Sequence, residues 1–426
     1  MAPPRAKRPT VFYGWVIVAA SFSAMSVYGF FFSFGVFYKP LMDHFGWSAT
    51  EVAVAPSIMS IVYLLTVMPM SLAYKRFGLR PVIILGSLLM ASGLALCGQA
   101  TASWQLYLFF GVLASIGTST LWVPFSSTIM NWFSKKRGLA MAIALSGAGF
   151  GSLYVPPLLA YLIIVYGWRT AFLVAGFLSF SIVFSAGLVM KKAPEEIGLR
   201  PYGDVLAERS PVPSPLQESR DEAIHARTVR GTVRGVEFWL LYGLWLLSTI
   251  VKSVYDQQLV LYAITIGITV ITASIALGTI GLSSIVGRLF IGLLLDKIGT
   301  RRALALCFLL NLVSSLLLLL TNNELSLYLF AVIFGLSFGG RTTLEVPIVG
   351  EFFGLADLVT ILGILETAFG VGGFVGPYLA GRIYDVTGRY FELFSLCAIL
   401  SAILLAISMS LKPAKRAKTT HSQLQF

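Results

Sequence analysis

Six ionisable residues lie inside long apolar stretches of the second half of the chain. They are of both signs, three of each: Lys252, Asp256, Arg288, Arg341, Glu345 and Glu366. If these stretches cross a bilayer, an ionised side chain at its centre costs at least about 2.5–3.5 kcal/mol, so each needs a partner, a water-filled cavity or a function. We find no such residue in the apolar stretches of the first half. The second half is therefore expected to carry the ion chemistry.

Arg288 is the strongest candidate for binding a negatively charged ligand. It lies about 12 Å from Asp296, the end of its apolar stretch, at a helical rise of roughly 1.5 Å per residue, which places it close to mid-membrane. A planar guanidinium binds a carboxylate through two N–H groups. The alternative is a structural ion pair with Glu366 or Asp256.

The other charges form two pairs with helical spacing. Arg341 and Glu345 are four residues apart, as are Lys252 and Asp256, so each pair can face on one helix and neutralise itself. If Arg341 instead faces a cavity, two guanidinium groups favour a dicarboxylate. The predicted proton carriers are Asp256, Glu366 and Glu345, in that order of preference.

Neutral ligands for the same substrate are expected from polar and aromatic residues midway along stretches of the first half. The candidates are Tyr28, Tyr63, Ser115, Ser119, Trp122 and Tyr154. Their donors can hold a second oxygen of an anion while their rings enclose an apolar part. Each of them can equally be an ordinary packing residue.

The composition places these residues in a membrane protein. Of 426 residues, 57% are hydrophobic and 12% are charged, against about 25% charged in soluble domains. The net charge of +12 comes from joints between apolar stretches, so we assign it to membrane topology rather than to nucleic acid. Cys97, Cys307 and Cys397 lie within the stretches, which argues against disulfides and a metal cluster, and no cofactor is expected.

The apolar stretches predict twelve transmembrane helices, each long enough for a core of about 30 Å. They lie near 13–38, 52–74, 81–101, 105–129, 138–165, 170–190, 238–262, 272–295, 303–320, 327–350, 357–382 and 391–411. The basic residues of the joints concentrate on the side that bears both termini, which predicts cytoplasmic termini.

An internal repeat divides the twelve helices into two halves. One constant offset superposes Gly78 on Gly299, Arg80 on Arg301, Pro156 on Pro377 and Gly167 on Gly388. We therefore predict an all-α membrane protein with two six-helix bundles, at 1–190 and 237–411, joined by a cytoplasmic linker at 191–236 and followed by a cytoplasmic tail at 412–426. The linker is too polar to fold alone.

The motif G-L-L-L-D-K-I-G-T-R-R, from Gly292 to Arg302, resembles the loop signature of the major facilitator superfamily. That resemblance implies alternating access between two bundles and a gating role for Asp296, Arg301 and Arg302. The simpler reading is topogenic charge at the membrane surface.

A narrower resemblance, to the monocarboxylate transporter group and its bacterial relatives that include oxalate:formate antiporters, covers nearly the whole chain. It rests on Y-G-W-V-I-V at Tyr13–Val18, the stretch Trp132–Gly151, the G-W-R at Gly167–Arg169, and P-E-E-I-G-L-R-P-Y-G-D at Pro194–Asp204. It implies that Arg288 is the eighth-helix arginine that binds the anion. The first-helix lysine of the proton-coupled animal members is absent, and Ser284 replaces their aspartate, so their mode of coupling does not carry over.

These observations predict a secondary transporter of small organic anions, by proton symport of a monocarboxylate such as lactate or pyruvate. The alternatives are proton-independent anion or dicarboxylate antiport and, from another class, a non-transporting receptor. An enzyme is disfavoured because no nucleophile with a base lies at membrane depth. The expected partners are the anion, a proton and the lipid bilayer, with a monomer in a bacterial inner membrane.

Overall fold

The computed structural model describes residues 12–203, 231–353 and 358–411, without the side chains of Asp296 and Val359. Regular structure in these ranges consists of helices and one isolated bridge between Phe133 and Tyr202. Eleven of the described helical segments are long and apolar enough to cross a membrane. One of them, α9, joins two helices across a kink at Gly167, so the described chain provides twelve spans.

The first six spans run from Tyr13 to Val189. They are built from α1 (Tyr13–Ser26), α2 (Tyr28–Phe32), η1 (Phe34–Phe37), α3 (Tyr38–Phe45), α4 (Ala49–Phe77), α5 (Leu79–Cys97), α6 (Ser103–Leu106), η2 (Tyr107–Ala114), α7 (Ser115–Ser119), α8 (Trp122–Trp132) and α9 (Arg137–Val189).

The last six spans are single helices. They follow a short 3₁₀ turn, η3 (Pro194–Ile197), and are α11 (Val236–Thr265), α12 (Val270–Ile298), α13 (Thr300–Leu319), α14 (Glu324–Phe353), α15 (Leu358–Thr387) and α16 (Phe391–Ser410).

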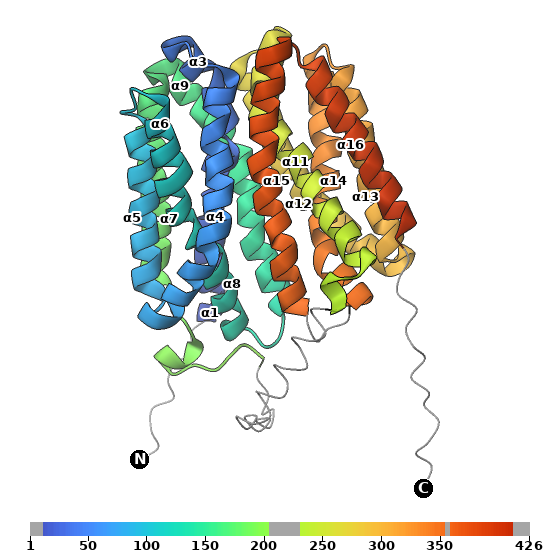
Figure 1. Ribbon diagram of the computed structural model, residues 1–426. Coiled ribbons are helices and arrows are strands. Elements are labelled where there is room, and N and C mark those ends of the chain that lie inside the picture. The colour runs from blue at the N-terminus through green and yellow to red at the C-terminus, as the bar shows by residue number, and fades with distance from the viewer. Residues whose placement is uncertain (1–11, 204–230, 354–357, 412–426) are drawn as a thin grey trace, which may run out of the picture.

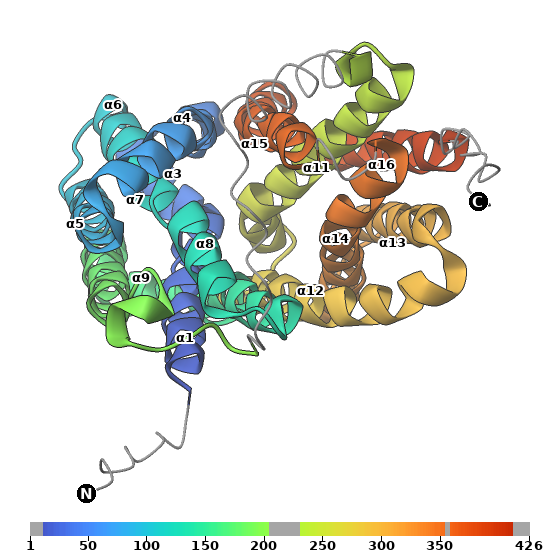
Figure 2. The same ribbon diagram turned by 90° about the horizontal axis from the view of Figure 1, so that it is seen from below.

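The helices form two bundles that lie side by side (Figure 1). Two seams join them, because α4 packs against α15 and the first part of α9 packs against α12 (Figure 2). Helix α1 begins and α16 ends at the same side of the molecule, which we call the terminal side. The opposite side is called the far side.

The first span is longer and less regular than the predicted 13–38. It continues to Phe45 and is interrupted at Val27 and at Ser33, where a 3₁₀ turn begins. Close packing accompanies these breaks: a Cβ on Gly29 would lie 2.4 Å from the backbone of Gly151 on α9. The fourth span is likewise broken, with a π-helical turn at Tyr107–Ala114. Sequence periodicity did not reveal these breaks, because both stretches are apolar enough overall to predict one continuous helix each.

The internal repeat has a structural counterpart in backbone conformation. Gly78 and Gly299 have φ of +88° and +79°, and Gly167 and Gly388 have φ of +82° and +66°, a region that L side chains rarely adopt. The repeated arginines also act alike. Arg80 Nε donates to the carbonyl of Met190 at 3.2 Å, and Arg301 donates to the carbonyl of Met409 at the end of the last span.

The first part of the predicted linker is held against the first bundle. Tyr202 N donates to the carbonyl of Trp132 at 2.9 Å, and its ring packs with Phe12, Trp15 and Phe133. Because these aromatic partners come from other elements, the local polarity of residues 191–203 gave no sign of this docking. Residues 204–230 of the linker and the tail at 412–426 lie outside the described chain.

Candidate functional site

Arg288 lies on the seam between the two bundles. Its Nη1 donates to the carbonyl of Leu145 on α9 at 3.4 Å, and its buried Nε has no hydrogen-bond partner. In the part of the chain that the structure describes, no carboxylate lies within ion-pair distance of Arg288. The predicted alternative, a structural pair with Glu366 or Asp256, is therefore not formed, and the guanidinium keeps donors for a ligand.

Arg341 is a second buried guanidinium with unused donors. It is only 5% exposed, and its Nε and Nη1 have no partner. Its Cζ lies 5.3 Å from the ring centre of Trp245 and 5.6 Å from that of Phe338. The expected pair with Glu345 is not closed to ion-pair distance within the described residues. Aromatic faces thus provide much of the immediate surroundings of this charge.

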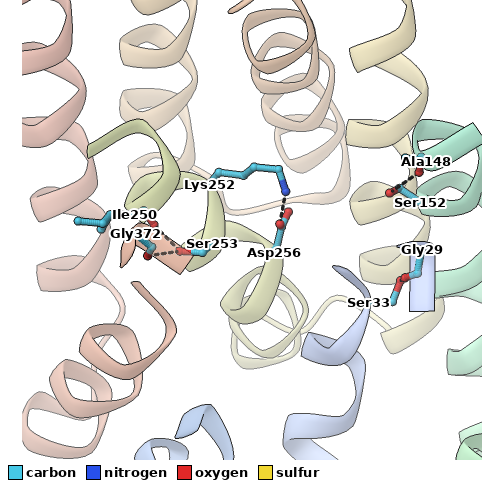
Figure 3. A network of polar contacts seen from close by, with 9 residues as sticks. All are labelled: Gly29, Ser33, Ala148, Ser152, Ile250, Lys252, Ser253, Asp256 and Gly372. Atoms are coloured by element: carbon cyan, nitrogen blue, oxygen red, sulfur yellow. Dashed lines mark hydrogen bonds and ion pairs between the residues drawn. The ribbon is translucent and has the colours of Figure 1, made fainter. Parts of the chain in front are cut away.

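Lys252 and Asp256 form the ion pair that their spacing predicts (Figure 3). Both residues are buried, at 7% exposure each. The Lys252 Nζ also lies 4.4 Å from the ring centre of Phe32 on the first span and 4.8 Å from that of Phe338 on α14. Two cations, Lys252 and Arg341, therefore lie against the Phe338 ring.

Glu366 faces the space between the bundles. Its side chain is exposed, yet it interacts electrostatically with the buried Arg341 and with Tyr28 and Tyr63 of the other bundle. A residue on the lipid-facing surface would not meet groups from both bundles. Glu345 also interacts with Arg341 and is half-buried. Of the three predicted proton carriers, Glu366 is thus the most open to solvent and Asp256 is the one already paired.

The neutral candidates separate into two groups. Tyr28 and Tyr63 share a hydrogen bond of 3.3 Å, and both interact electrostatically with Glu366. The ring of Trp122 meets Tyr28 edge-on at 6.3 Å. Ser115 and Ser119 donate to the backbone carbonyls of Met59 and Ile116, at 2.7 and 2.8 Å, and are occupied with helix contacts.

Tyr154 makes contacts of its own with the first span and with α9. Its hydroxyl is 3.4 Å from that of Ser26, and its ring packs against Phe150 on α9.

The predicted gating residues lie at the terminal side, at the junction of α12 and α13. Arg301 donates to the last turn of α16 within its own bundle, and Arg302 is exposed. The side chain of Asp296 lies outside the described residues. Neither described arginine makes a hydrogen bond to the other bundle within the described chain.

The far side of the molecule is closed by a contact between the bundles. Asp385 near the end of α15 accepts hydrogen bonds from the backbone N–H groups of Ala49 and Thr50, at 2.9 and 2.8 Å. These N–H groups have no partner within α4, because they lie in its first turn, and the helix dipole also favours a carboxylate there. A Cβ on Gly381 would lie 2.8 Å from the Ala49 carbonyl oxygen, so the helices touch directly.

The same seam stays closely packed as far as the middle of α4. A Cβ on Gly373 would lie 2.6 Å from the Ser60 hydroxyl, and one on Gly370 would lie 2.7 Å from the Leu64 side chain. The two bundles therefore touch from the far side to about the middle of this seam, and Glu366, one helical turn before Gly370, is exposed.

Comparison with known proteins agrees with this geometry. The sequence profile of the Major Facilitator Superfamily matches residues 20–263 and 254–424. The chain belongs to this superfamily. It is therefore a transporter and not an enzyme, and the predicted fold of twelve helices in two bundles is confirmed.

Its relatives place this major facilitator in the monocarboxylate transporter group. Monocarboxylate transporter 13 of Rattus norvegicus is 30% identical over 405 residues, which cover 94% of this chain and 89% of the relative. Monocarboxylate transporter 2 of Homo sapiens is 26% identical over 419 residues, with 96% and 86% covered. The predicted resemblance is confirmed.

A solved structure shares the fold. It is a bacterial homolog of the human lysosomal transporter Spinster in an inward-facing and unoccupied conformation, with a TM-score of 0.69 at 16% identity, covering 95% of this chain and 96% of that one. At this identity the likeness shows the fold alone.

Sequence reasoning missed the aromatic residues around the two inner cations. Phe32, Trp245 and Phe338 come from three different spans and surround Lys252 and Arg341. Helical spacing could have pointed to two of these rings, since Phe338 lies three residues before Arg341 and Trp245 lies seven before Lys252. Phe32 comes from another span, and no signal in the sequence distinguishes it from a packing residue. Lys252 itself was visible as half of an i, i+4 pair.

We expect replacement of Asp385 by Asn to weaken the far-side closure of this transporter. The substitution removes the negative charge that faces the start of α4. Such a charge at an exposed helix N-terminus stabilises by about 1 kcal/mol. Its loss should shift the equilibrium between the closed and open far side by roughly fivefold. Spin labels on Thr101→Cys and Asn322→Cys, which lie in far-side loops of the two bundles, would report a larger population of long distances.

Glu51→Gln is the matched control. Glu51 caps the same end of α4 through Ser48, but from within the first bundle. It should lower stability slightly and leave the distance distribution unchanged. Equal distributions for wild type and Asp385→Asn would show that the far-side contact does not hold the bundles together.

Proposed function

We propose that this protein moves small organic monocarboxylates, such as lactate or pyruvate, together with a proton across a bacterial inner membrane, as a monomer with both termini in the cytoplasm. The observation that carries the proposal is the state of Arg288, a guanidinium on the seam between the bundles whose contacts leave it without a counter-ion among the described residues. An anion cannot enter a hydrocarbon core alone, so a buried cation must replace its water.

The names of the relatives support the same cargo. Two monocarboxylate transporters align over most of this chain, and Arg288 occupies the eighth span, where the group's signature implies an anion-binding arginine. We propose Tyr28, Tyr63 and Trp122 as neutral neighbours of the cargo, because they lie together on the other bundle and the two tyrosines interact with Glu366. The remaining candidates would act indirectly, by fixing the positions of the helices that they contact: Ser115, Ser119 and Tyr154.

Proton coupling is proposed for the carboxylates of the second bundle. Glu366 is exposed and interacts with groups of both bundles, so it would exchange protons with solvent. Asp256 and Glu345 lie deeper, beside Lys252 and Arg341. A proton carried with the anion leaves the loaded complex closer to neutral, which lowers the cost of moving it through the bilayer.

A second candidate, exchange of dicarboxylates without protons, has one observation in its favour. Lys252 and Arg341 supply two further cations beside one aromatic ring, enough for a second carboxylate. Gating by Asp296, Arg301 and Arg302 at the terminal side is common to both candidates.

The two candidates make opposite predictions for uptake into proteoliposomes. For symport, an inward proton gradient of about two pH units should raise pyruvate uptake by roughly tenfold or more, since each pH unit is equivalent to about 1.4 kcal/mol. For exchange, uptake should depend on preloaded oxalate and be indifferent to the gradient. Uptake that ignores the gradient would rule out symport, and liposomes without protein give the background.

A further inference from the structure

The ion pair of Lys252 and Asp256 costs stability that the fold does not require. Both side chains are buried midway along α11. Removing two charges from water is so costly that well-packed apolar residues in their place are often neutral or stabilising by about 1–4 kcal/mol. Spans α13 and α16 of the same bundle have no charged residue midway. The pair therefore calls for a function.

The pair also lies at a contact that changes during transport. Phe32, which covers the Lys252 ammonium, belongs to the first span, and Phe338 belongs to α14 of the second bundle. Directly beside them, a Cβ on Gly35 would lie 2.6 Å from the carbonyl oxygen of Asp256, so the backbones of the two bundles touch. Alternating access separates the bundles on one side at a time. Opening at the far side would therefore uncover the ammonium.

The ammonium has spare capacity for a ligand. An ammonium has three donors, and the hydrogen bond to Asp256 uses one of them. The rings of Phe32 and Phe338 also lie against Nζ, and they stabilise a cation but do not neutralise it. Arg341 lies over the same Phe338 ring with two nitrogen atoms that have no partner. The surroundings of Phe338 thus hold two cations and one closely paired carboxylate.

From this arrangement we infer that Lys252 is a ligand for the transported anion and that Asp256 occupies its place in the empty carrier. The carboxylate of the cargo displaces the Asp256 side chain from the ammonium and completes the site with Arg341. A protonated Asp256 gives up Lys252 more readily, so taking up a proton at Asp256 favours binding of the anion. The inference rests on the proposed function. It identifies Lys252 as the residue for which the cargo carboxylate and Asp256 compete.

The other charges near the pair leave this competition intact. Within the described chain no second carboxylate lies within ion-pair distance of Lys252. The nearest elements contribute Arg341 and Glu345 on α14, Glu366 on α15 and Arg288 on α12, while η1 contributes no charge. The two acids interact with Arg341. Asp256 is therefore the carboxylate that governs whether Lys252 is free.

Binding of pyruvate and of oxalate to the full-length purified protein, at about pH 5.5 and pH 8, tests the inference. Asp256→Asn frees Lys252, so it should tighten binding at the higher pH by about tenfold and remove most of the pH dependence. The double variant Lys252→Gln/Asp256→Asn keeps shape and neutrality but has no ammonium, and it should weaken binding by about tenfold or more.

A purely structural pair predicts the opposite order. Asp256→Asn alone would leave an unpaired buried ammonium and lower the melting temperature, and the double variant would restore wild-type binding. Lys39→Gln/Asp43→Asn is the matched control, because Lys39 and Asp43 form an exposed pair with the same spacing and a distance of 2.5 Å. This control should change neither the affinity for the anions nor its pH dependence.

The outcomes separate the inference from the proposed function. If the wild-type protein binds the anions and the double variant binds them equally well, Lys252 is not a ligand and the proposed function stands. If the wild-type protein binds neither pyruvate nor oxalate at either pH, the proposed function is wrong and the inference falls with it.

Discussion

Replacing Arg288 by Gln is expected to abolish uptake of the organic anion while leaving the fold intact. Glutamine can still donate to the Leu145 carbonyl, and no carboxylate among the described residues loses a partner when the charge is removed. The cargo, in contrast, loses the cation that replaces its water. Removing one partner of a buried charge pair costs about 2–5 kcal/mol, so binding should weaken by roughly 30-fold or more.

Two measurements separate the loss of transport from a loss of folding. Uptake of labelled pyruvate into proteoliposomes should fall to background, and the melting temperature in detergent should stay within a few degrees of wild type. Arg169→Gln is the contrasting variant, because Arg169 bonds the carbonyls of Gly98 and Ala100 within the first bundle. It should lower the melting temperature and retain uptake. Wild-type uptake by Arg288→Gln would remove Arg288 from the mechanism.

A methyl group at Gly151 is expected to be among the most damaging small changes in the chain. A Cβ there would lie 1.8 Å from the carbonyl oxygen of Ser26, a backbone atom that cannot move aside without shifting the whole first span. Overpacking of this kind costs about 1–3 kcal/mol and occasionally more. Gly151→Ala should therefore lower the melting temperature and the yield of folded protein.

Gly138 on the same helix α9 provides the control. No atom lies within 4 Å of a Cβ built there. Alanine is favoured over glycine in a helix by about 1 kcal/mol, so Gly138→Ala should be neutral or slightly stabilising. If both variants melted at the wild-type temperature, α1 and α9 would not be in tight contact at Ser26 and Gly151.

The pairing of Lys252 with Asp256 could be predicted because it depends on counting along one helix. Residues four apart on a helix lie on the same face, so their spacing alone brings them within reach of each other. The same rule did not bring Arg341 to Glu345, because the rings of Trp245 and Phe338 lie beside that guanidinium. The mid-membrane depth of Arg288 stays a prediction.

Other parts of the site depended on contacts between spans. The structure brings together Tyr28, Tyr63 and Trp122. The hydroxyl groups of Ser115 and Ser119 instead donate hydrogen bonds to backbone carbonyls. All five are polar or aromatic residues at similar depth, so composition could not separate them. The contact of Asp385 with the start of α4 joins two residues more than 300 positions apart, and no pattern in the sequence points to it.

The sequence by itself determined that the chain spans a membrane twelve times, that its halves repeat, and that its buried charges lie in the second half. These properties follow from hydrophobic length and spacing, because lipid requires every span to be an apolar helix. The tertiary structure alone decided which faces of those helices meet and where the two bundles touch. In lipid, faces that meet another helix and faces that meet hydrocarbon are both apolar, so sequence periodicity cannot tell them apart.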